Sequence, residues 1–171
     1  MRITVLRLGH RFMRDKRIST HIGLVARALG ADELLMDVRD PDVEESIAAV
    51  KSEWGGSFSV GVVEDWKRCI KDFSGDRIHL TMYGIGVSDC MGKIRGSGRD
   101  KLIIVGGKKV PSEVYHMVDY NVAVGGQPHS EVAALAIFLD RLLEGAWESK
   151  DFLGRKTIIP QEHGKLVEEK P

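Results

Sequence analysis

The sequence has few features that would commit it to an unusual environment. It contains two cysteines, Cys69 and Cys90, which do not form a CxxC pair, and its formal net charge is zero. Neither a disulfide framework nor a partner attracted by bulk charge is therefore predicted. No apolar run approaches the length of a membrane span. The opening residues MRITVLRLGH do not have the form of a signal peptide, so we expect a cytoplasmic protein.

Several common catalytic signatures are also absent. The sequence has no GxxxxGK[ST] phosphate loop, no HExxH pair, no GxSxG elbow and no Cys/His cluster at zinc spacing. The stretch GIGVSD (84–89) begins like the dinucleotide fingerprint but has Asp89 where the third glycine should stand. A P-loop nucleotidase, a zinc enzyme and a Rossmann NAD site are thus disfavoured, and no metal is expected.

The apolar pattern alternates between strand and helix along the 171 residues. With 43% hydrophobic and 29% charged residues, the chain has the balance of an ordinary soluble domain. Strand, helix, strand, helix throughout predicts an α/β fold, a parallel sheet with helices on both faces. We expect one domain over 1–145 and a weakly patterned C-terminal extension over 146–171. The strands are expected at 2–8, 33–38, 57–63, 77–84, 101–107 and 120–126, and the helices at 18–30, 42–55, 64–73, 87–94, 111–117 and after Ser130.

Three of these strands end in loops that could line a pocket. The loops are HLTMYG (79–84), IIVGGKKVP (103–111) and VAVGGQPHSE (122–131). In parallel sheets, ligands bind at the carboxyl ends of strands. Glycines there let the backbone approach a ligand closely, and free N–H groups beside a helix N-terminus bind polar atoms. The alternative is three ordinary tight turns, but two Gly-Gly loops after successive strands favour a ligand pocket.

The final helix is apolar on nearly every side. Val132 to Leu139 are eight apolar residues in a row, whereas a surface helix shows only a stripe. One side can meet the sheet, and we expect the other to meet a second copy of the chain in a homodimer. Burial under the C-terminal extension is the alternative.

The helix at 18–30 has two distinct sides. Ile18, Ile22, Val25 and Leu29 recur at helical spacing and are expected to face the core. Arg27 falls on another side together with Lys16, Thr20 and Gly23. Periodicity alone favours a solvated or salt-bridged arginine at this position.

A basic run opens the chain and could follow a nucleic-acid backbone. Its cationic residues are Arg7, Arg11, Arg14, Lys16 and Arg17, set against the single Asp15. Such a patch would bind phosphates in a salt-dependent way. A second basic loop, KIRGSGRDK (93–101), could join the same surface. The alternative is that both are solvated charged loops.

Taken together, three stretches resemble a known family. VAVGGQPHSEVAALAIFLDR, LIIVGGKKVP and LRLGHRFMRDKRISTHIGLVARALGA resemble the archaeal tRNA (cytidine-2′-O)-methyltransferases of the SPOUT superfamily, which modify the ribose of cytidine 56 in the T-loop. The resemblance runs from the first strand to about residue 145. The family motif has Asn where Gly126 stands, a departure that should slightly loosen the loop without changing the chemistry.

The resemblance implies a C-terminal trefoil knot, a rare exception among folds, that holds S-adenosylmethionine. It also implies that Arg27 serves the ribose 2′-hydroxyl and that tRNA is the partner. Other readings are a SPOUT enzyme acting on another RNA or on a base, and a non-catalytic RNA- or nucleotide-binding module. The implied cofactor-binding residues are Leu80, Thr81, Gly106, Gly107, Lys108, Lys109, Val110, Val124, Gly125, Gly126, Gln127, Pro128, His129, Ser130 and Glu131.

Overall fold

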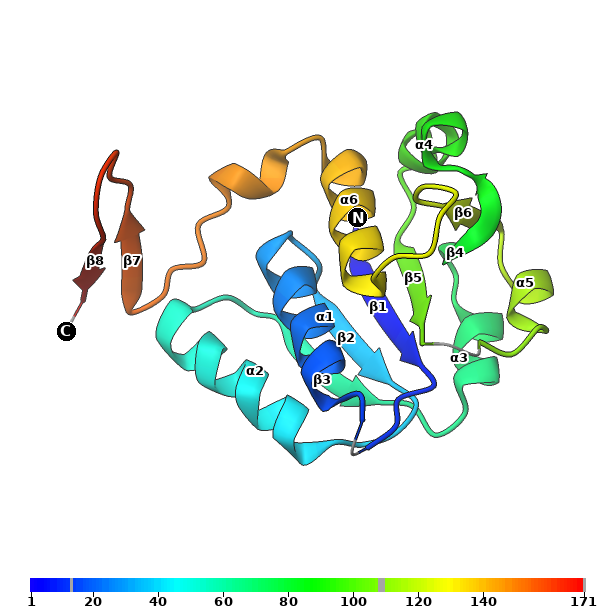
Figure 1. Ribbon diagram of the computed structural model, residues 1–171, viewed down its shortest axis with the longest axis horizontal. Coiled ribbons are helices and arrows are strands. Elements are labelled where there is room, and N and C mark those ends of the chain that lie inside the picture. Colours follow the sequence, from blue (N-terminus) through cyan, green and yellow to red (C-terminus); the bar gives the residue numbers. More distant parts are fainter. Residues whose placement is uncertain (13, 108–109, 171) are drawn as a thin grey trace.

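A six-stranded sheet forms the centre of the protein (Figure 1), and the computed structural model describes residues 1–12, 14–107 and 110–170. Every pairing in this sheet is parallel, and the strand order is β3-β2-β1-β5-β4-β6. The predicted parallel sheet is confirmed. Its strands are β1 (Ile3–Leu8), β2 (Glu33–Met36), β3 (Ser59–Val62), β4 (Asp76–Gly86), β5 (Lys101–Gly106) and β6 (Tyr120–Ala123).

Helices cover both faces of the sheet, as predicted. On one face Ile22, Ile47, Ile94 and Phe138, from four different helices, are buried in one core cluster. On the other face two further helices bury Ile70 and Val114 in a second cluster. No helix in the described parts of the chain is long and apolar enough to cross a bilayer. The helices are α1 (Lys16–Ala28), α2 (Pro41–Trp54), α3 (Trp66–Asp72), α4 (Val87–Gly96), α5 (Val114–Met117) and α6 (Glu131–Leu143).

The parallel order gives the sheet two chemically different edges. The carboxyl ends of all six strands lie along one edge, called here the carboxyl edge, and their starts lie along the opposite amino edge. Each crossover helix begins at the carboxyl edge and ends near the amino edge. Ser130 caps the start of α6 by accepting a hydrogen bond from the Val132 N–H, as predicted.

The buried side of α1 differs from the prediction. Ile22 is fully buried, but Ile18 is 37% exposed, and the buried residues include Gly23 and Arg27. The expectation that Ile18 faces the core, and that Arg27 is solvated, is therefore wrong. The reason is α2, which packs closely against this side: a Cβ at Gly23 would lie 2.3 Å from Ile47 Cδ1.

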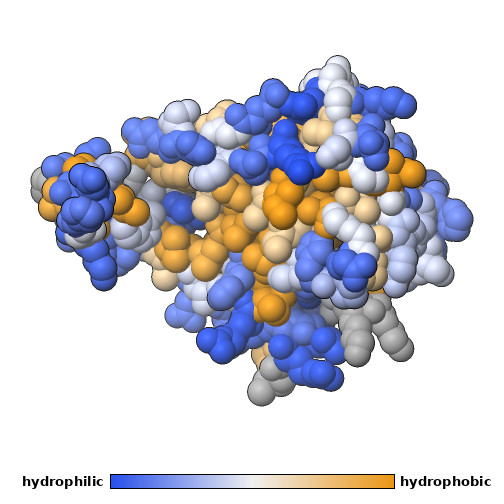
Figure 2. Space-filling view, turned by 45° about the horizontal axis from the view of Figure 1, so that its top comes forward, coloured by the Kyte–Doolittle hydropathy of each residue, from blue (hydrophilic) through white to orange (hydrophobic). Residues whose placement is uncertain are grey.

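The outer side of α6 remains uncovered by its own chain. Leu135, Phe138, Leu139 and Leu142 point into the core, while Ile137 is 42% exposed. Figure 2 shows apolar atoms gathered in the middle of the face on which α1 and α6 lie. The C-terminal extension therefore does not fully bury α6, and that alternative is wrong.

The C-terminal extension is more ordered than its weak pattern predicted. It continues from α6 through the 3₁₀ turn η1 (Ala146–Ser149) to a hairpin of β7 (Lys156–Ile159) and β8 (Leu166–Glu169). The hairpin stands apart from the sheet (Figure 1). The sequence did not predict it, because a two-stranded ribbon exposed on both faces carries no alternating apolar signal.

Candidate active site

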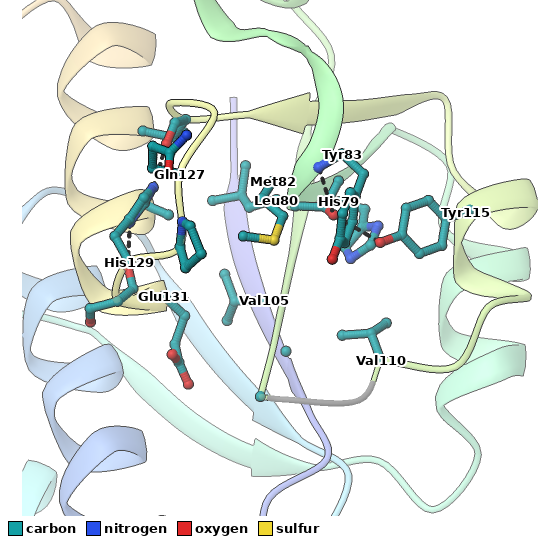
Figure 3. Close-up of a pocket in the computed structure, with 17 residues that line it drawn as sticks. His79, Leu80, Met82, Tyr83, Val105, Val110, Tyr115, Gln127, His129 and Glu131 are labelled. Carbon is teal, nitrogen blue, oxygen red and sulfur yellow. Dashed lines mark hydrogen bonds between the residues drawn. The ribbon is translucent and has the colours of Figure 1, made fainter.

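A cavity of about 870 Å³ lies at the carboxyl edge, where β4, β5 and β6 end (Figure 3). Ligand pockets in proteins usually span roughly 300–1,000 Å³, so it is large enough for a nucleoside-sized molecule. The three segments that the sequence singled out converge on it, although residues 79–84, expected as a loop, are part of strand β4. Its walls are His79, Leu80, Thr81, Met82 and Tyr83 from β4, Val105, Gly106, Gly107 and Val110 around the end of β5, Tyr115 from α5, and Val124, Gln127, Pro128, His129, Ser130, Glu131 and Ala134 around the start of α6.

Most of the implied cofactor-binding residues line this cavity. Gly125 and Gly126 belong to the same loop but do not line it, and Lys108 and Lys109 lie outside the described residues. Gly125 has a φ of 80°, a conformation that favours glycine. A Cβ at Gly126 would meet nothing within 4 Å, so the Asn of the family motif would fit there. The His129 ring donates to the Val124 carbonyl and closes the loop.

The sequence did not predict the polar cluster on the β4 side of the cavity. The Thr81 and Tyr115 hydroxyls are 2.8 Å apart, and the His79 ring meets the Tyr115 ring edge-on at 4.8 Å between centroids. These contacts join β4 to α5 across more than thirty residues, so no local pattern could have indicated them. The other lining residues absent from the implied cofactor-binding set are Met82, Tyr83, Val105 and Ala134. Of these, only Ala134 lies outside the three segments that the sequence singled out.

The hydrogen bonds around His79 define its protonation. Asn121 Nδ2 donates to the Tyr115 carbonyl at 2.9 Å, which leaves the Asn121 oxygen as acceptor for His79 Nδ1 at 3.0 Å. Nδ1 therefore carries the proton, and Nε2 keeps a free lone pair. Burial lowers the pKa of His79 and outweighs the opposing hydrogen bond from Asn121. Burial therefore favours the neutral form of the His79 imidazole.

Glu131 supplies the carboxylate of the opposite wall, and a buried arginine holds it. Arg7 Nη2 lies 3.3 Å from Glu131 Oε1, and the Arg7 side chain is 1% exposed. Burial lowers the pKa of Arg7, although the charge of Glu131 opposes the change. The prediction that Arg7 belongs to a surface RNA-binding patch is wrong, because a guanidinium beneath the cavity cannot reach an RNA backbone.

A chain of hydrogen bonds extends from Arg7 away from the cavity. The Arg7 Nε and the Ser19 hydroxyl are 3.5 Å apart, Ser19 lies 2.8 Å from His10 Nδ1, and His10 Nε2 lies 2.9 Å from Asp40. All four residues are buried. Asp40 is also the N-cap of α2, so this network ties the wall of the cavity to the start of a second helix.

The remaining basic residues of the run do lie on the surface. Arg11, Arg14, Lys16 and Arg17 are exposed on the loop after β1 and the first turn of α1, at the carboxyl edge. Two of them already have acidic partners: Arg11 pairs with Asp15 at 2.9 Å and Lys16 with Asp42 at 2.6 Å. The second basic loop is at the other edge, since it precedes β5, so it does not join this surface.

Arg27 lies at the amino edge, in the last turn of α1, and lines no part of the cavity. Its Nη2 donates to the Gly55 carbonyl at 2.7 Å, and its guanidinium carbon lies 4.7 Å from the centre of the Phe152 ring. Burial lowers the pKa of Arg27. Its Nε is buried without a hydrogen-bond partner among the described residues.

A metal site is not apparent among the described residues. No group of three or more His, Cys, Asp or Glu side chains in these parts of the chain could hold an ion. The polar groups around the cavity are instead backbone amides, hydroxyls, two imidazoles, a side-chain amide and a carboxylate, which suit an organic ligand with several donors and acceptors.

Comparison with known proteins identifies the family. Residues 54–168 match the profile described as "tRNA ribose 2′-O-methyltransferase, aTrm56". The chain belongs to this family. A relative from Methanothrix thermoacetophila is 56% identical over 98% of this chain and 97% of its own, and one from Pyrococcus abyssi is 53% identical over 98% and 87%. Both are named tRNA (cytidine(56)-2′-O)-methyltransferase, as is one from Methanocaldococcus jannaschii, 54% identical over 98% and 96%.

Solved structures of more distant proteins share the fold of this aTrm56 family member. An RNA 2′-O ribose methyltransferase matches with a TM-score of 0.63 at 13% identity, over 84% of this chain and 56% of its own. The SpoU methyltransferase AviRb from Streptomyces viridochromogenes, solved with its cofactor AdoMet, matches at 0.58 and 19% identity over 84% and 57%. The predicted α/β architecture, a parallel sheet with helices on both faces, is therefore confirmed.

Proposed function

We propose that this protein transfers a methyl group from S-adenosylmethionine to the 2′-hydroxyl of cytidine 56 in the T-loop of tRNA. One observation carries the proposal. The loops by which the chain resembles this family converge on one cavity of suitable size at the carboxyl edge. The names of the relatives, at more than 50% identity over nearly the whole chain, support the substrate.

The cavity residues fit the proposed cofactor. The loop from Val124 to Ser130 offers backbone N–H groups beside the start of α6, where a helix favours polar and anionic groups. Gly106 and Gly107 line the opposite wall of the cavity. When bound there, S-adenosylmethionine would supply the electrophilic methyl group of its sulfonium. The task left to the protein is to position the ribose oxygen and to accept its proton.

Arg27 suits the role of orienting the ribose better than that of a bare base. An arginine guanidinium holds its proton far above neutral pH, so deprotonation near pH 7 costs on the order of 8 kcal/mol. Burial reduces this cost, but a neighbouring RNA phosphate would restore it by favouring the charged form. We propose that Arg27 holds the ribose and its phosphate and stabilises the developing alkoxide.

A second copy of the chain would bring Arg27 to the cavity. Within one chain, Arg27 and the cavity lie at opposite edges of the sheet. The exposed apolar residues on α1 and α6, including Ile18 and Ile137, offer a face for a homodimer. We propose that each cavity receives Arg27 of the partner subunit. The return of α6 from the β6 side to lie beside α1 is compatible with the implied trefoil knot, which we include in the proposal.

Arg11, Arg14, Lys16 and Arg17 are proposed to contact the tRNA backbone. They are exposed at the same edge as the cavity, so RNA bound there would place its ribose near the cofactor. The Arg14→Gln variant should weaken tRNA binding and reduce its salt dependence while leaving S-adenosylmethionine affinity unchanged.

The test of the reaction uses tritiated S-adenosylmethionine and T-loop transcripts. We expect label on the transcript with its target cytidine, and none when that cytidine is replaced. Label on the replaced transcript would indicate another RNA position, and cofactor binding without any transfer would indicate a non-catalytic module. Arg27→Lys and Arg27→Ala should both lose activity, and near-normal transfer by Arg27→Ala would remove Arg27 from the mechanism.

Mixing two inactive variants tests the shared cavity. Arg27→Ala keeps the cavity, and Gly125→Val, at a φ of 80° that disfavours a branched side chain, displaces the cavity loop while keeping Arg27. If Arg27 serves the other subunit, random heterodimers hold one complete site and the mixture regains roughly a quarter of the wild-type activity. If Arg27 serves its own subunit, mixing restores nothing.

A further inference from the structure

The C-terminal extension crosses the ends of two helices in a way that fixes Arg27. Lys150 Nζ donates to the Gly30 carbonyl, just after α1, at 3.4 Å. Further along, the Gly56 N–H donates to the Phe152 carbonyl at 2.7 Å, just after α2, and Gly55 forms a bridge with Leu153. The extension is thus tied to the chain on both sides of the Arg27 side chain.

This crossing is built for close backbone contact. A Cβ at Gly55 would lie 2.2 Å from the Phe152 carbonyl oxygen, and one at Gly154 would lie 2.3 Å from the backbone of Trp54. Real Cβ atoms do not come so near to backbone, so both positions require glycine. The contact places the Phe152 ring and the Gly55 carbonyl together.

Both contacts of the Arg27 guanidinium depend on that crossing. The Gly55 carbonyl accepts from Arg27 Nη2 at 2.7 Å, and the Phe152 ring lies 4.7 Å from the guanidinium carbon. A cation close to an aromatic face is attracted by the ring quadrupole. Arg27 Nε remains buried and without a partner in the described chain, and a buried polar group left unpaired in a native structure calls for an explanation.

We infer that Phe152 is a positioning residue for Arg27: the extension holds the guanidinium against the ring and so fixes the orientation in which it meets an acceptor brought by another molecule. This inference rests on the proposed function, in which that acceptor belongs to the ribose or phosphate of the tRNA. It assigns a role to Lys150, Phe152 and Gly154, which do not line the cavity of their own chain. If an aromatic ring is sufficient to position Arg27, the Phe152→Tyr and Phe152→Trp variants should keep the function, whereas Phe152→Leu should lose it.

The test compares four variants of the full-length protein. Phe152→Leu keeps an apolar side chain but removes the aromatic face, Phe152→Tyr retains it, Phe152→Ala removes both, and Leu153→Ala is the matched control, because Leu153 is 81% exposed. We expect Phe152→Leu and Phe152→Ala to lower kcat roughly tenfold or more. The S-adenosylmethionine Kd should be unchanged, and Phe152→Tyr and Leu153→Ala should resemble the wild type. Equal kcat for Phe152→Leu and wild type, or loss in all variants in proportion to a lower Tm, would overturn the inference.

A second measurement does not depend on catalysis. Phenylglyoxal modifies accessible guanidinium groups, and peptide mapping reports the modification of Arg27 alone. We expect Arg27 to be protected in the wild type, Phe152→Tyr and Leu153→Ala, and modified several-fold faster in Phe152→Ala. Equal rates in all four proteins would overturn the inference. A wild type that protects Arg27 but transfers no methyl group would instead contradict the proposed function and leave the placement of Arg27 standing.

Discussion

Lys101 at the amino edge and Arg7 at the carboxyl edge are both fully buried cations, but their surroundings differ. The Lys101 ammonium donates to Asp76, Ser97 and the Arg99 carbonyl at 2.9, 2.8 and 2.6 Å. The Arg7 guanidinium lies 3.1, 3.3 and 3.5 Å from the Leu8 carbonyl, Glu131 and Ser19. Lys101 is therefore fully paired with neighbours that stabilise the fold, whereas Arg7 makes longer contacts beside a cavity.

The same contrast makes Arg27 exceptional. The buried carboxylate of Asp76 is stabilised by its partners. Burial alone would raise its pKa, but hydrogen bonds from Ser97 and Lys101 and the charges of Lys101 and Arg99 lower it. Arg27, at the same edge, retains an unpaired buried N–H. Arg27 thus lacks a hydrogen-bond partner for its Nε–H, unlike Asp76, and we propose that Arg27 interacts with the tRNA.

The largest expected effect is on the amino edge. Lys101→Met would leave Asp76, which is 0% exposed, without its buried partner. Removing one member of a buried ion pair costs about 3–5 kcal/mol of unfolding free energy, and Arg99 nearby favours the lower figure. Urea unfolding measures the loss, with exposed Lys93→Met as control. A drop in S-adenosylmethionine affinity of the folded variant would contradict the separation of the two edges.

Arg7→Met is expected to lower the stability by less than Lys101→Met, but also to weaken cofactor binding. Glu131 would lose its charged partner, at a cost of about 2 kcal/mol of stability. The start of α6 would also lose its anchor, so we expect the S-adenosylmethionine Kd to rise about tenfold, or about 1.4 kcal/mol. Calorimetry and urea unfolding measure the two effects. Glu131→Gln, which keeps the shape of the wall, is the companion variant, and normal cofactor binding by Arg7→Met would make Arg7 purely structural.

The cavity loop offers a matched pair of glycines. Gly125→Ala places a Cβ at a φ of 80°, which costs roughly 1–2 kcal/mol and should displace the loop. Gly126→Ala enters open space and should change little. We expect a several-fold weaker S-adenosylmethionine affinity for the first variant only. Equal affinities would mean that the loop conformation does not matter for the cofactor.

The smallest effect concerns the surface pair beside the cavity. The hydrogen bond from Arg11 lowers the pKa of Asp15 to about 2. Because a folded-state pKa below the ordinary value of about 3.9 stabilises the folded form at higher pH, the contribution is complete above about pH 4 and disappears as the pH falls through 2. Arg11→Gln should thus be less stable than wild type at pH 6 and equal to it near pH 2. Arg14→Gln is the control, and a difference that persists at pH 2 would contradict the assignment.

The sequence predicted what depends on local pattern. The alternation of elements, the cap at Ser130 and the glycine loops after the strands all follow from short-range chemistry. The burial of Arg7 does not, because its carboxylate, Glu131, is far away along the chain. The strand expected at 2–8 includes Arg7, but the local pattern gives no sign that a charged residue there is buried. The His79–Tyr115 contact and the burial of Arg27 likewise depend on how helices pack.

The crossing of Gly55 and Gly154 has an evolutionary consequence. The two glycines are far apart in the sequence, yet each leaves room for the other's strand of backbone. Once Gly55 or Gly154 has been replaced, the close backbone contact is lost. The other glycine and the ring of Phe152 are then no longer needed at their positions. Among descendants of a common ancestor, these three positions should therefore be retained or abandoned together.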